Sequence, residues 1–228
     1  MNLDAIVEGL PLYLEGLLTT VQLLLLALAF GWAAAVPLAI ARASRKRWLA
    51  LPVWGFTYVI RGTPMLVQLF LIYYGLAQFE AVRASVLWPW LSSAWFCAVL
   101  AFAVNTCAYT TEIIAGAMRT MAAGEIEAAH SLGMSRWLVV RRIVLPSALR
   151  RSLPACSNEA IMMLHGTSLA SVVTLLDLTG AAREVNSRFF LPFEAFITAA
   201  LFYLALTFVL VALFHRAEKR WLAYLQPR

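Results

Sequence analysis

Charged residues are scarce in this chain, and their scarcity excludes most soluble classes of protein. Only 13% of the 228 residues are Asp, Glu, Lys or Arg, whereas a soluble domain typically carries about 25%. Hydrophobic residues make up 62% of the chain, and they gather in runs of about 20 residues, the length that spans a bilayer. This composition excludes a water-soluble enzyme, a secreted disulfide scaffold and a disordered chain.

Motifs for covalent chemistry and for metal binding are also missing. The three cysteines, Cys97, Cys107 and Cys156, lie in or near apolar stretches without C-x-x-C spacing, which predicts small buried thiols. The chain has no G-x-x-x-x-G-K-[ST] phosphate-binding loop, no H-E-x-x-H pair and no G-x-S-x-G elbow. The sequence therefore predicts no catalytic residue, no metal site and no cofactor held by this chain.

Five apolar segments have the length of transmembrane helices, so the predicted fold is all-α and polytopic, with a single membrane domain over residues 1–228. The spans are expected at about 16–40, 63–79, 94–118, 154–176 and 195–214. Residues 48–60 contain Pro52 and Gly55 and are expected to lie at the membrane interface. Pro154 suits the first turn of the fourth span, and residues 177–194 are expected to form a loop.

The distribution of Lys and Arg predicts how the chain is oriented in the membrane. The net charge of +6 is explained by the cations that gather on one side of the membrane. Four cations lie in residues 42–47, six in residues 119–151 and four in the tail from Arg216. Only three lie on the opposite side, and Arg61 stands at a span boundary. The positive-inside rule makes the cation-rich side cytoplasmic. Five spans then place the N-terminus outside and the C-terminus inside. The acidic first 15 residues are not expected to be a cleaved signal peptide.

Residues 119–153 form the one extended hydrophilic segment and are expected to be a cytoplasmic loop. Within it, the stretch AAGEIEAAHSLG at 122–133 repeats its apolar residues at about helical spacing. Gly133 is expected to end this helix, because glycine accepts the left-handed conformation of a helix cap. A short amphipathic helix that projects from a membrane domain favours docking into a groove of a soluble partner. A helix lying on the bilayer is the alternative.

The same segment carries a specific resemblance. Glu127, Ala128 and Ala129 are followed after three residues by Gly133 and, nine residues later, by an I-x-L-P run that ends at Pro146. This pattern resembles the EAA-x3-G-x9-I-x-L-P loop of the membrane subunits of ABC importers. The resemblance implies a coupling helix that fits a cleft of a cytoplasmic ATPase, with Glu127, Ala128, Ala129 and Gly133 as its main contact.

Three further segments narrow the resemblance to the polar amino-acid subfamily. Residues 61–64, RGTP, with Gln68 are similar to its RGTP-x3-Q signature. Asn105, Tyr109 and Glu112 are similar to its N-x3-Y-x2-E run, and residues 167–171 to its TSLAS segment. The nearest form is the M-type subunit of importers for histidine, lysine, arginine, ornithine or opines.

The resemblance implies the partners of this chain. A homologous Q-type permease would supply the other half of the translocation path, and two ATPase subunits would bind ATP and Mg²⁺. A periplasmic binding protein would deliver the amino acid. The chain would then lie among lipid in a bacterial inner membrane and would bind no nucleic acid.

Ionisable residues inside a span are candidates for function, because burying a charge in the bilayer costs about 2.5–3.5 kcal/mol. Glu159 shares one helical face with Asn158, Met162, His165 and Gly166. This face could bind a cationic amino acid or line a passage. The related permeases often carry Gln or another residue at this position, a departure that fits a cationic substrate. Alternatively, Glu159 pairs with an arginine of the hydrophilic loop, such as Arg150 or Arg151.

Two other charged residues have competing interpretations. Glu112 shares a face with Asn105 and Tyr109, where it could join two helices, form a gate or line the pathway. Arg61, beside Gly62 and Pro64, could hold the carboxylate of a substrate or anchor its span at the cytoplasmic face.

A self-sufficient secondary carrier or a channel is the alternative function. In that case the helix at 122–133 would be a surface helix without an ATPase partner. The absence of an internal repeat in the sequence disfavours the common secondary carriers.

Overall fold

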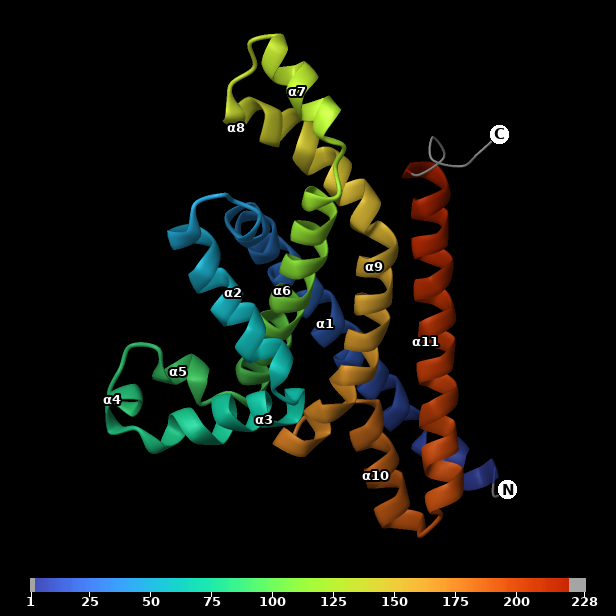
Figure 1. Ribbon diagram of the computed structural model, residues 1–228. Helices are drawn as coiled ribbons and strands as arrows, with labels where there is room; N and C mark the ends of the chain where they lie inside the picture. The colour runs from blue at the N-terminus through green and yellow to red at the C-terminus, as the bar shows by residue number, and fades with distance from the viewer. Residues whose placement is uncertain (1–2, 222–228) are drawn as a thin grey trace.

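The computed structural model describes residues 3–221, and within that range the chain forms helices and no strand (Figure 1). The α-helices are α1 (Leu3–Arg42), α2 (Arg47–Gly62), α3 (Met65–Phe70), α4 (Glu80–Arg83), α5 (Trp88–Leu91), α6 (Ala94–Arg119), α7 (Ala123–Ser131), α8 (Arg136–Val139), α9 (Leu145–Gly166), α10 (Leu178–Phe189) and α11 (Pro192–Trp221). Short π- or 3-10-helical segments are η1 (Leu71–Gly75), η2 (Leu76–Gln78), η3 (Val140–Val144) and η4 (Thr167–Val173). The end of the expected cytoplasmic tail, with Arg228, lies outside the described residues.

Three helices are long and apolar enough to cross a membrane alone: α1 from Ile6, α6 and α11. Two further spans arise if each bent helix pair counts as one. These pairs are α2 with the helix from Met65 to Gln78, and residues 136–173 with α10. The structure therefore holds three spans, or up to five, and the third expected span, 94–118, coincides with α6.

Helix α6 lies at the centre of the molecule, against α1, α2, α3 and α9. Its contact with α1 is close, because a Cβ added to Gly31 would lie 2.6 Å from the Thr106 side chain. Alanines such as Ala98 and Ala101 are fully buried beside Phe102 on the same helix. Small residues of this kind let helices in a membrane approach closely.

The second expected span is divided differently in the structure. Residues 47–62, placed at the interface by the sequence, form the helix α2, with Pro52 inside it. The chain then turns by 104° before α3. Thr63 has an extended backbone because the following Pro64 disfavours the α conformation of its neighbour. The proline pattern therefore interrupts the span at its expected start.

The fourth span also differs from its expectation. Helix α9 begins at Leu145 with Pro146 in its first turn, so Pro154 lies inside the helix and does not start it. The expected loop at 177–194 is mostly the helix α10, whose first turn is capped by the Asp177 side chain. Arg183, Glu184 and Arg188 of that segment lie on this amphipathic helix, whose periodicity the sequence-based prediction did not identify.

The two ends of the molecule differ (Figure 1). Helices α7 and α8 project beyond the end of α6 at one end, toward which the last turns of α11 also run. The start of α1 lies at the opposite end, beside α10 and the first turns of α11. The first and last described helices therefore have their outer ends on opposite sides.

Candidate functional site

A cavity of about 990 Å³ opens between α2, α3, α6, α9 and η4. It lies where the α2–α3 break faces the middle of α9. Six of the seven expected pathway residues line it: Arg61, Asn105, Tyr109, Asn158, Glu159 and His165. The entire predicted face of the fourth span, with Met162 and Gly166, also borders this cavity. The helical periodicity of the sequence thus identified one complete wall.

Glu159 is the buried acid of this wall, with 8% of its surface exposed. Donor groups of Trp32 and Thr106 approach its carboxylate. However, Glu159 Oε2, Trp32 Nε1 and Thr106 Oγ1 are all buried without a hydrogen-bond partner of normal geometry among the described residues. An unpartnered buried carboxyl oxygen is costly, so this wall of the cavity keeps an acidic side chain with one oxygen that the described chain leaves without a partner.

The alternative ion pair of Glu159 with the hydrophilic loop is not formed. Arg151 instead lies 3.9 Å from Glu125, measured from Nη2 to Oε1. Among the described residues, neither Arg150 nor Arg151 forms an ion pair with Glu159. The structure therefore does not contain the ion pair that the structural alternative expected for this acid.

Arg61 provides the cavity with a positive charge. Its guanidinium lies over the ring of Tyr109, 5.0 Å from the centroid, a cation–π contact between α2 and α6. Arg61 stands fourteen positions after Arg47 on the same helix, which corresponds to about 21 Å along α2. Arg61 is therefore at the opposite end of α2 from the cation-rich loop.

Gln68 does not line the cavity but bonds to Thr63 and Asn105, which do, and the sequence did not predict this supporting role. Its Nε2 donates to the backbone oxygens of Ile60 and Thr63, at 2.6 and 3.0 Å, and to the Thr63 hydroxyl at 2.8 Å. Asn105 Nδ2 donates to Gln68 Oε1 at 3.1 Å. These bonds satisfy carbonyls left free at the end of α2. A lone glutamine in an apolar run just after the Pro64 break was the available signal.

His165 lies at the opposite side of the same wall and connects it to α11. Its Nε2 is 3.4 Å from the Thr207 hydroxyl, and Thr207 in turn donates to the Tyr203 carbonyl at 2.8 Å. Asn158, one turn below Met162, completes the polar part of the α9 face.

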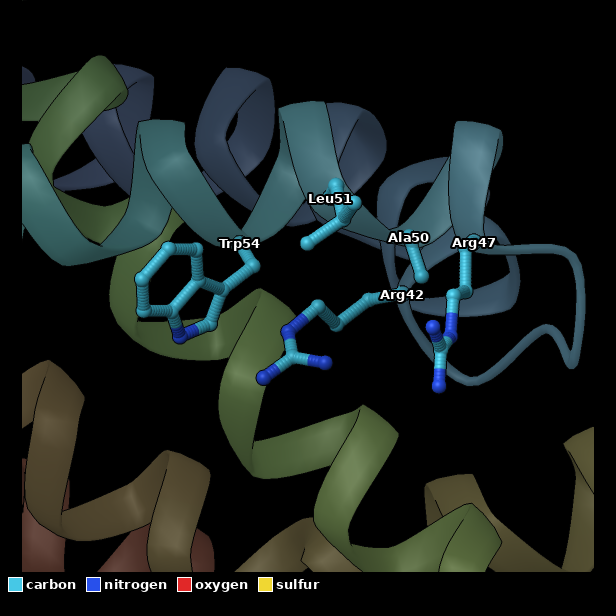
Figure 2. A pocket seen from close by; sticks show the side chains of 5 residues that line it. All are labelled: Arg42, Arg47, Ala50, Leu51 and Trp54. Carbon is cyan, nitrogen blue, oxygen red and sulfur yellow. The ribbon is translucent and has the colours of Figure 1, made fainter.

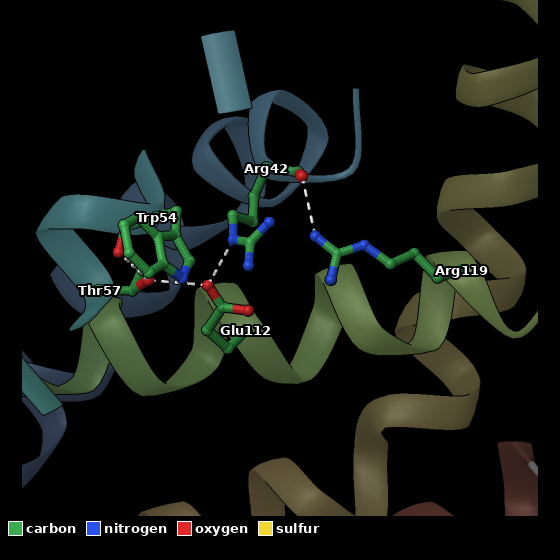
Figure 3. Close-up of polar contacts among 5 residues, drawn as sticks. All are labelled: Arg42, Trp54, Thr57, Glu112 and Arg119. Carbon is green, nitrogen blue, oxygen red and sulfur yellow. Dashed lines mark hydrogen bonds and ion pairs between the residues drawn. The ribbon is translucent and has the colours of Figure 1, made fainter. Parts of the chain in front are cut away.

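Glu112 is the one expected pathway residue that does not line the cavity. Its Oε1 accepts from Arg42 Nε at 2.6 Å and from the Thr57 hydroxyl at 2.7 Å (Figure 3). Arg119 donates to the backbone carbonyl of Arg42 at 2.9 Å. Glu112 therefore joins α1, α2 and α6, as the helix-joining alternative expected. It lies about one helical turn beyond Tyr109 on α6 and contacts Thr57, whereas Tyr109 contacts Arg61.

The hydrophilic loop forms the expected short helix, α7, and Gly133 ends it with a φ of +76°. Glu127, Ala128 and Gly133 are exposed, whereas Ala129 is buried against the base of the loop. Leu132 is 83% exposed although its spacing placed it on the apolar face. The helix thus presents both polar and apolar surface at the tip of the molecule (Figure 1).

In the described part of the chain, no three His, Cys, Asp or Glu side chains gather closely enough to hold a metal ion. The three cysteines are buried free thiols. The cavity is lined by a carboxyl group, an imidazole ring, side-chain amides and a guanidinium group. These groups suit a zwitterionic or charged small molecule.

Comparison with known families agrees with this geometry. Residues 17–222 match the family described as binding-protein-dependent transport system inner membrane component.

Several curated relatives are similar over nearly their whole length. The histidine/lysine/arginine/ornithine transport system permease protein HisM of Escherichia coli is 48% identical, over 93% of this chain and 90% of that protein. The nopaline transport system permease protein NocM of Agrobacterium fabrum is 45% identical, over 96% and 91%. The octopine transport system permease protein OccM of Rhizobium meliloti is 43% identical, over 94% and 84%.

Solved structures share the fold. A crystal structure of an amino acid ABC transporter with histidines superimposes with a TM-score of 0.85, at 34% identity, over 96% of this chain and 99% of that one. An inward-facing structure of the MetNI methionine ABC transporter gives a TM-score of 0.76 at 16% identity, over 92% and 95%.

Proposed function

The chain belongs to the family of binding-protein-dependent transport system inner membrane components, and we propose that its cavity takes a basic amino acid or an opine. As a member of this family it is a permease subunit of an ABC importer for amino acids. The permease is a transport component, and ATP hydrolysis is assigned to a separate subunit.

The observation that supports a cationic substrate is the buried, unpartnered carboxylate of Glu159 in the cavity wall. A cationic side chain of the substrate supplies the missing partner, and the charge-assisted hydrogen bond offsets the cost of burying both groups. An uncharged substrate leaves Glu159 in its unfavourable state. The protein then discriminates among amino acids by how well each one supplies a hydrogen-bond partner to the Glu159 carboxyl group.

Arg61 is the complementary group for the substrate carboxylate. It lines the same cavity as Glu159 and is fixed against the Tyr109 ring. Arginine binds carboxylates in a planar, two-point geometry. An acid on one helix and a guanidinium on another match the two charged ends of a basic amino acid. The names of the HisM and NocM relatives support the same substrate class.

Coupling to the ATPase is assigned to α7, through Glu127, Ala128 and Gly133, with Ala129 holding the helix on the loop. The exposed Leu132 adds an apolar contact for a groove on a soluble partner. We place this end in the cytoplasm, so that the N-terminus is periplasmic and the C-terminus cytoplasmic. The assembly would contain a homologous Q-type permease, two ATPase subunits and a periplasmic binding protein.

ATP hydrolysis by the assembled complex in nanodiscs tests the importer and its substrate class together. The readout is stimulation by the binding protein loaded with arginine, lysine, ornithine, histidine, an opine, glutamate or leucine in turn. We expect stimulation by the basic amino acids or by an opine and none by glutamate or leucine. Stimulation by glutamate alone would overturn the charge argument. A permease that co-purifies with no ATPase subunit and no ATPase activity would favour a secondary carrier.

The substitution Glu159→Gln tests the role of the acid directly. We expect uptake of a cationic substrate to fall about tenfold or more, since one charge-assisted hydrogen bond contributes about 1.5–3 kcal/mol. Stimulation of ATP hydrolysis by an unloaded binding protein should not change. The matched control is Glu184→Gln, an exposed acid on α10. Unchanged uptake in Glu159→Gln would make this acid structural.

A further inference from the structure

A second, smaller cavity of about 320 Å³ lies between the end of α1 and the first turns of α2 (Figure 2). Its wall consists of Arg42, Arg47, Ala50, Leu51 and Trp54. It shares no residue with the cavity that contains Glu159. Neither the coupling helix nor the proposed substrate path uses it.

The charge around this cavity is positive and incompletely paired. Arg42 Nε donates a hydrogen bond to Glu112. The two terminal nitrogens of Arg42 have no hydrogen-bond partner among the described residues. The Arg47 side chain forms no hydrogen bond or ion pair with any described residue. Figure 2 shows the guanidinium groups of both arginines directed to the same side. Arg119 adds a third guanidinium on the far side of Arg42 (Figure 3). One carboxylate, Glu112, opposes three cations.

The start of α2 adds to this positive field. The helix has 16 residues, no side chain caps its first turn, and that turn contains no acidic residue. The free backbone N–H groups of a helix start attract anions. They stand beside Arg47, so they extend the guanidinium site and do not form a separate one.

The remaining wall is apolar and open to the surroundings of the protein. Trp54 is 46% exposed and stacks at a tilt on Tyr58, with 5.3 Å between ring centroids. Leu51 is also exposed. Arginines next to exposed aromatic and aliphatic side chains match the chemistry of the lipid headgroup layer, where phosphates lie above acyl chains.

The position of the cavity along the molecule favours lipid over a segment of the ATPase. Arg42 is held at the level of Glu112, seven residues before the end of α6, which corresponds to about 10 Å along that helix. Helix α7 lies beyond that end (Figure 1). The cavity is therefore set back from the surface that faces the ATPase, at the depth where the first apolar span ends.

We propose that Arg42 and Arg47 bind the phosphate group of an anionic phospholipid between α1 and α2, with its acyl chains against Leu51 and Trp54. Arg42 then contacts the lipid phosphate and Glu112 at once. A bound lipid would thereby stabilise the contact of α1 and α2 with the central helix α6.

The test is lipid retention by the assembled complex in mild detergent, measured by native mass spectrometry with phosphatidylglycerol and phosphatidylcholine. We expect the Arg47→Gln complex to bind phosphatidylglycerol about fivefold more weakly than wild type, because one arginine at the headgroup level contributes about that factor. The matched control is Arg45→Gln, an exposed arginine of the same loop that does not border the cavity. It should bind as wild type does, and phosphatidylcholine should not distinguish the three proteins.

A second variant separates the possible sources of the phosphate. Trp54→Ala should weaken binding of phosphatidylglycerol, because the acyl chains lose an apolar contact that a free phosphate ion does not need. Equal retention of phosphatidylglycerol by wild type and Arg47→Gln would overturn the proposal. It would also be overturned if inorganic phosphate alone occupied the site in an Arg47-dependent way, or if the ATPase subunit protected Arg47 from chemical modification in lipid-free complexes.

Discussion

Asp177 and Glu159 are both buried acids, but their surroundings are opposite. Asp177 is fully buried where η4 meets α10. Its Oδ1 accepts from the Gly180 N–H at 2.8 Å, and its Oδ2 accepts from the Tyr203 hydroxyl at 3.1 Å. Glu159 is 8% exposed, borders the large cavity and keeps an oxygen without a partner in the described chain.

This difference separates an acid whose bonds serve the fold from the acid that we propose to bind a ligand. The bonds of Asp177 join α10 to α11 and fix the bend in the fourth span. A neighbouring bond, from the Leu178 N–H to the Thr20 hydroxyl, adds α1 to the same joint. Both carboxylate oxygens of Asp177 and the Thr20 hydroxyl therefore have hydrogen-bond partners inside the protein. Glu159 keeps one oxygen without such a partner, and the proposed cationic substrate would offset the cost of burying it.

The largest effect on stability is expected from Asp177→Ala. The change removes a helix cap, which contributes about 1 kcal/mol, and leaves the Tyr203 hydroxyl buried with one partner fewer. We expect a loss of about 2–3 kcal/mol, measured as a lower midpoint of thermal unfolding of the purified complex. Asp177→Asn is the control, because asparagine caps helices as well and its Nδ2 can donate to the Tyr203 hydroxyl oxygen. If both variants unfold alike, the joint does not depend on these bonds.

Glu112→Ala is expected to have an intermediate effect. Its carboxylate and the Arg42 guanidinium are each less than one-fifth exposed, so loss of the pair is partly compensated by water. We predict a loss of about 1–2 kcal/mol on the same thermal assay. The double variant with Arg42→Gln should lose less than the sum of the two single variants, because both act on one contact. Strict additivity would contradict this coupling.

Glu159→Leu should shift stability in the opposite direction. Replacing an unpartnered buried acid by an apolar side chain of similar size is expected to stabilise the complex by about 1 kcal/mol. Uptake of a basic substrate should be lost in the same protein, a trade of function for stability. Glu159→Gln serves as the polar control, with little gain in stability. A destabilised Glu159→Leu would mean that the acid has a partner in the assembled complex.

The smallest effect is expected for Glu184→Ala on the exposed side of α10. Glu184 pairs with Arg188 one helical turn away, at 2.9 Å, and both side chains are largely exposed. Such pairs contribute less than about 0.5 kcal/mol. Thermal unfolding should therefore be close to that of wild type, and a shift as large as that of Asp177→Ala would invalidate the comparison of buried with exposed acids.

Local patterns account for what sequence reasoning predicted well. The apolar run that became α6 is continuous, and the face of α9 from Asn158 to Gly166 follows one helical period, so both were predictable. The helix α7 and its stop at Gly133 depend on a few neighbouring residues. The segment that became α2 was misplaced, since Pro52 and Gly55 suggested an interruption that the helix tolerates.

The sequence alone determined that the chain is a bundle of apolar helices with one projecting loop helix, because run length, periodicity and the position of a glycine are properties of neighbouring residues. Only the tertiary structure decided which charged groups are satisfied. Asp177 finds Tyr203 on α11, Glu112 finds Arg42 on α1, 70 residues away, and Glu159 finds no comparable partner in the described chain. The donor and acceptor of a hydrogen bond must lie about 3 Å apart. Which side chains come that close depends on how the helices pack, and no pattern along the chain encodes this packing.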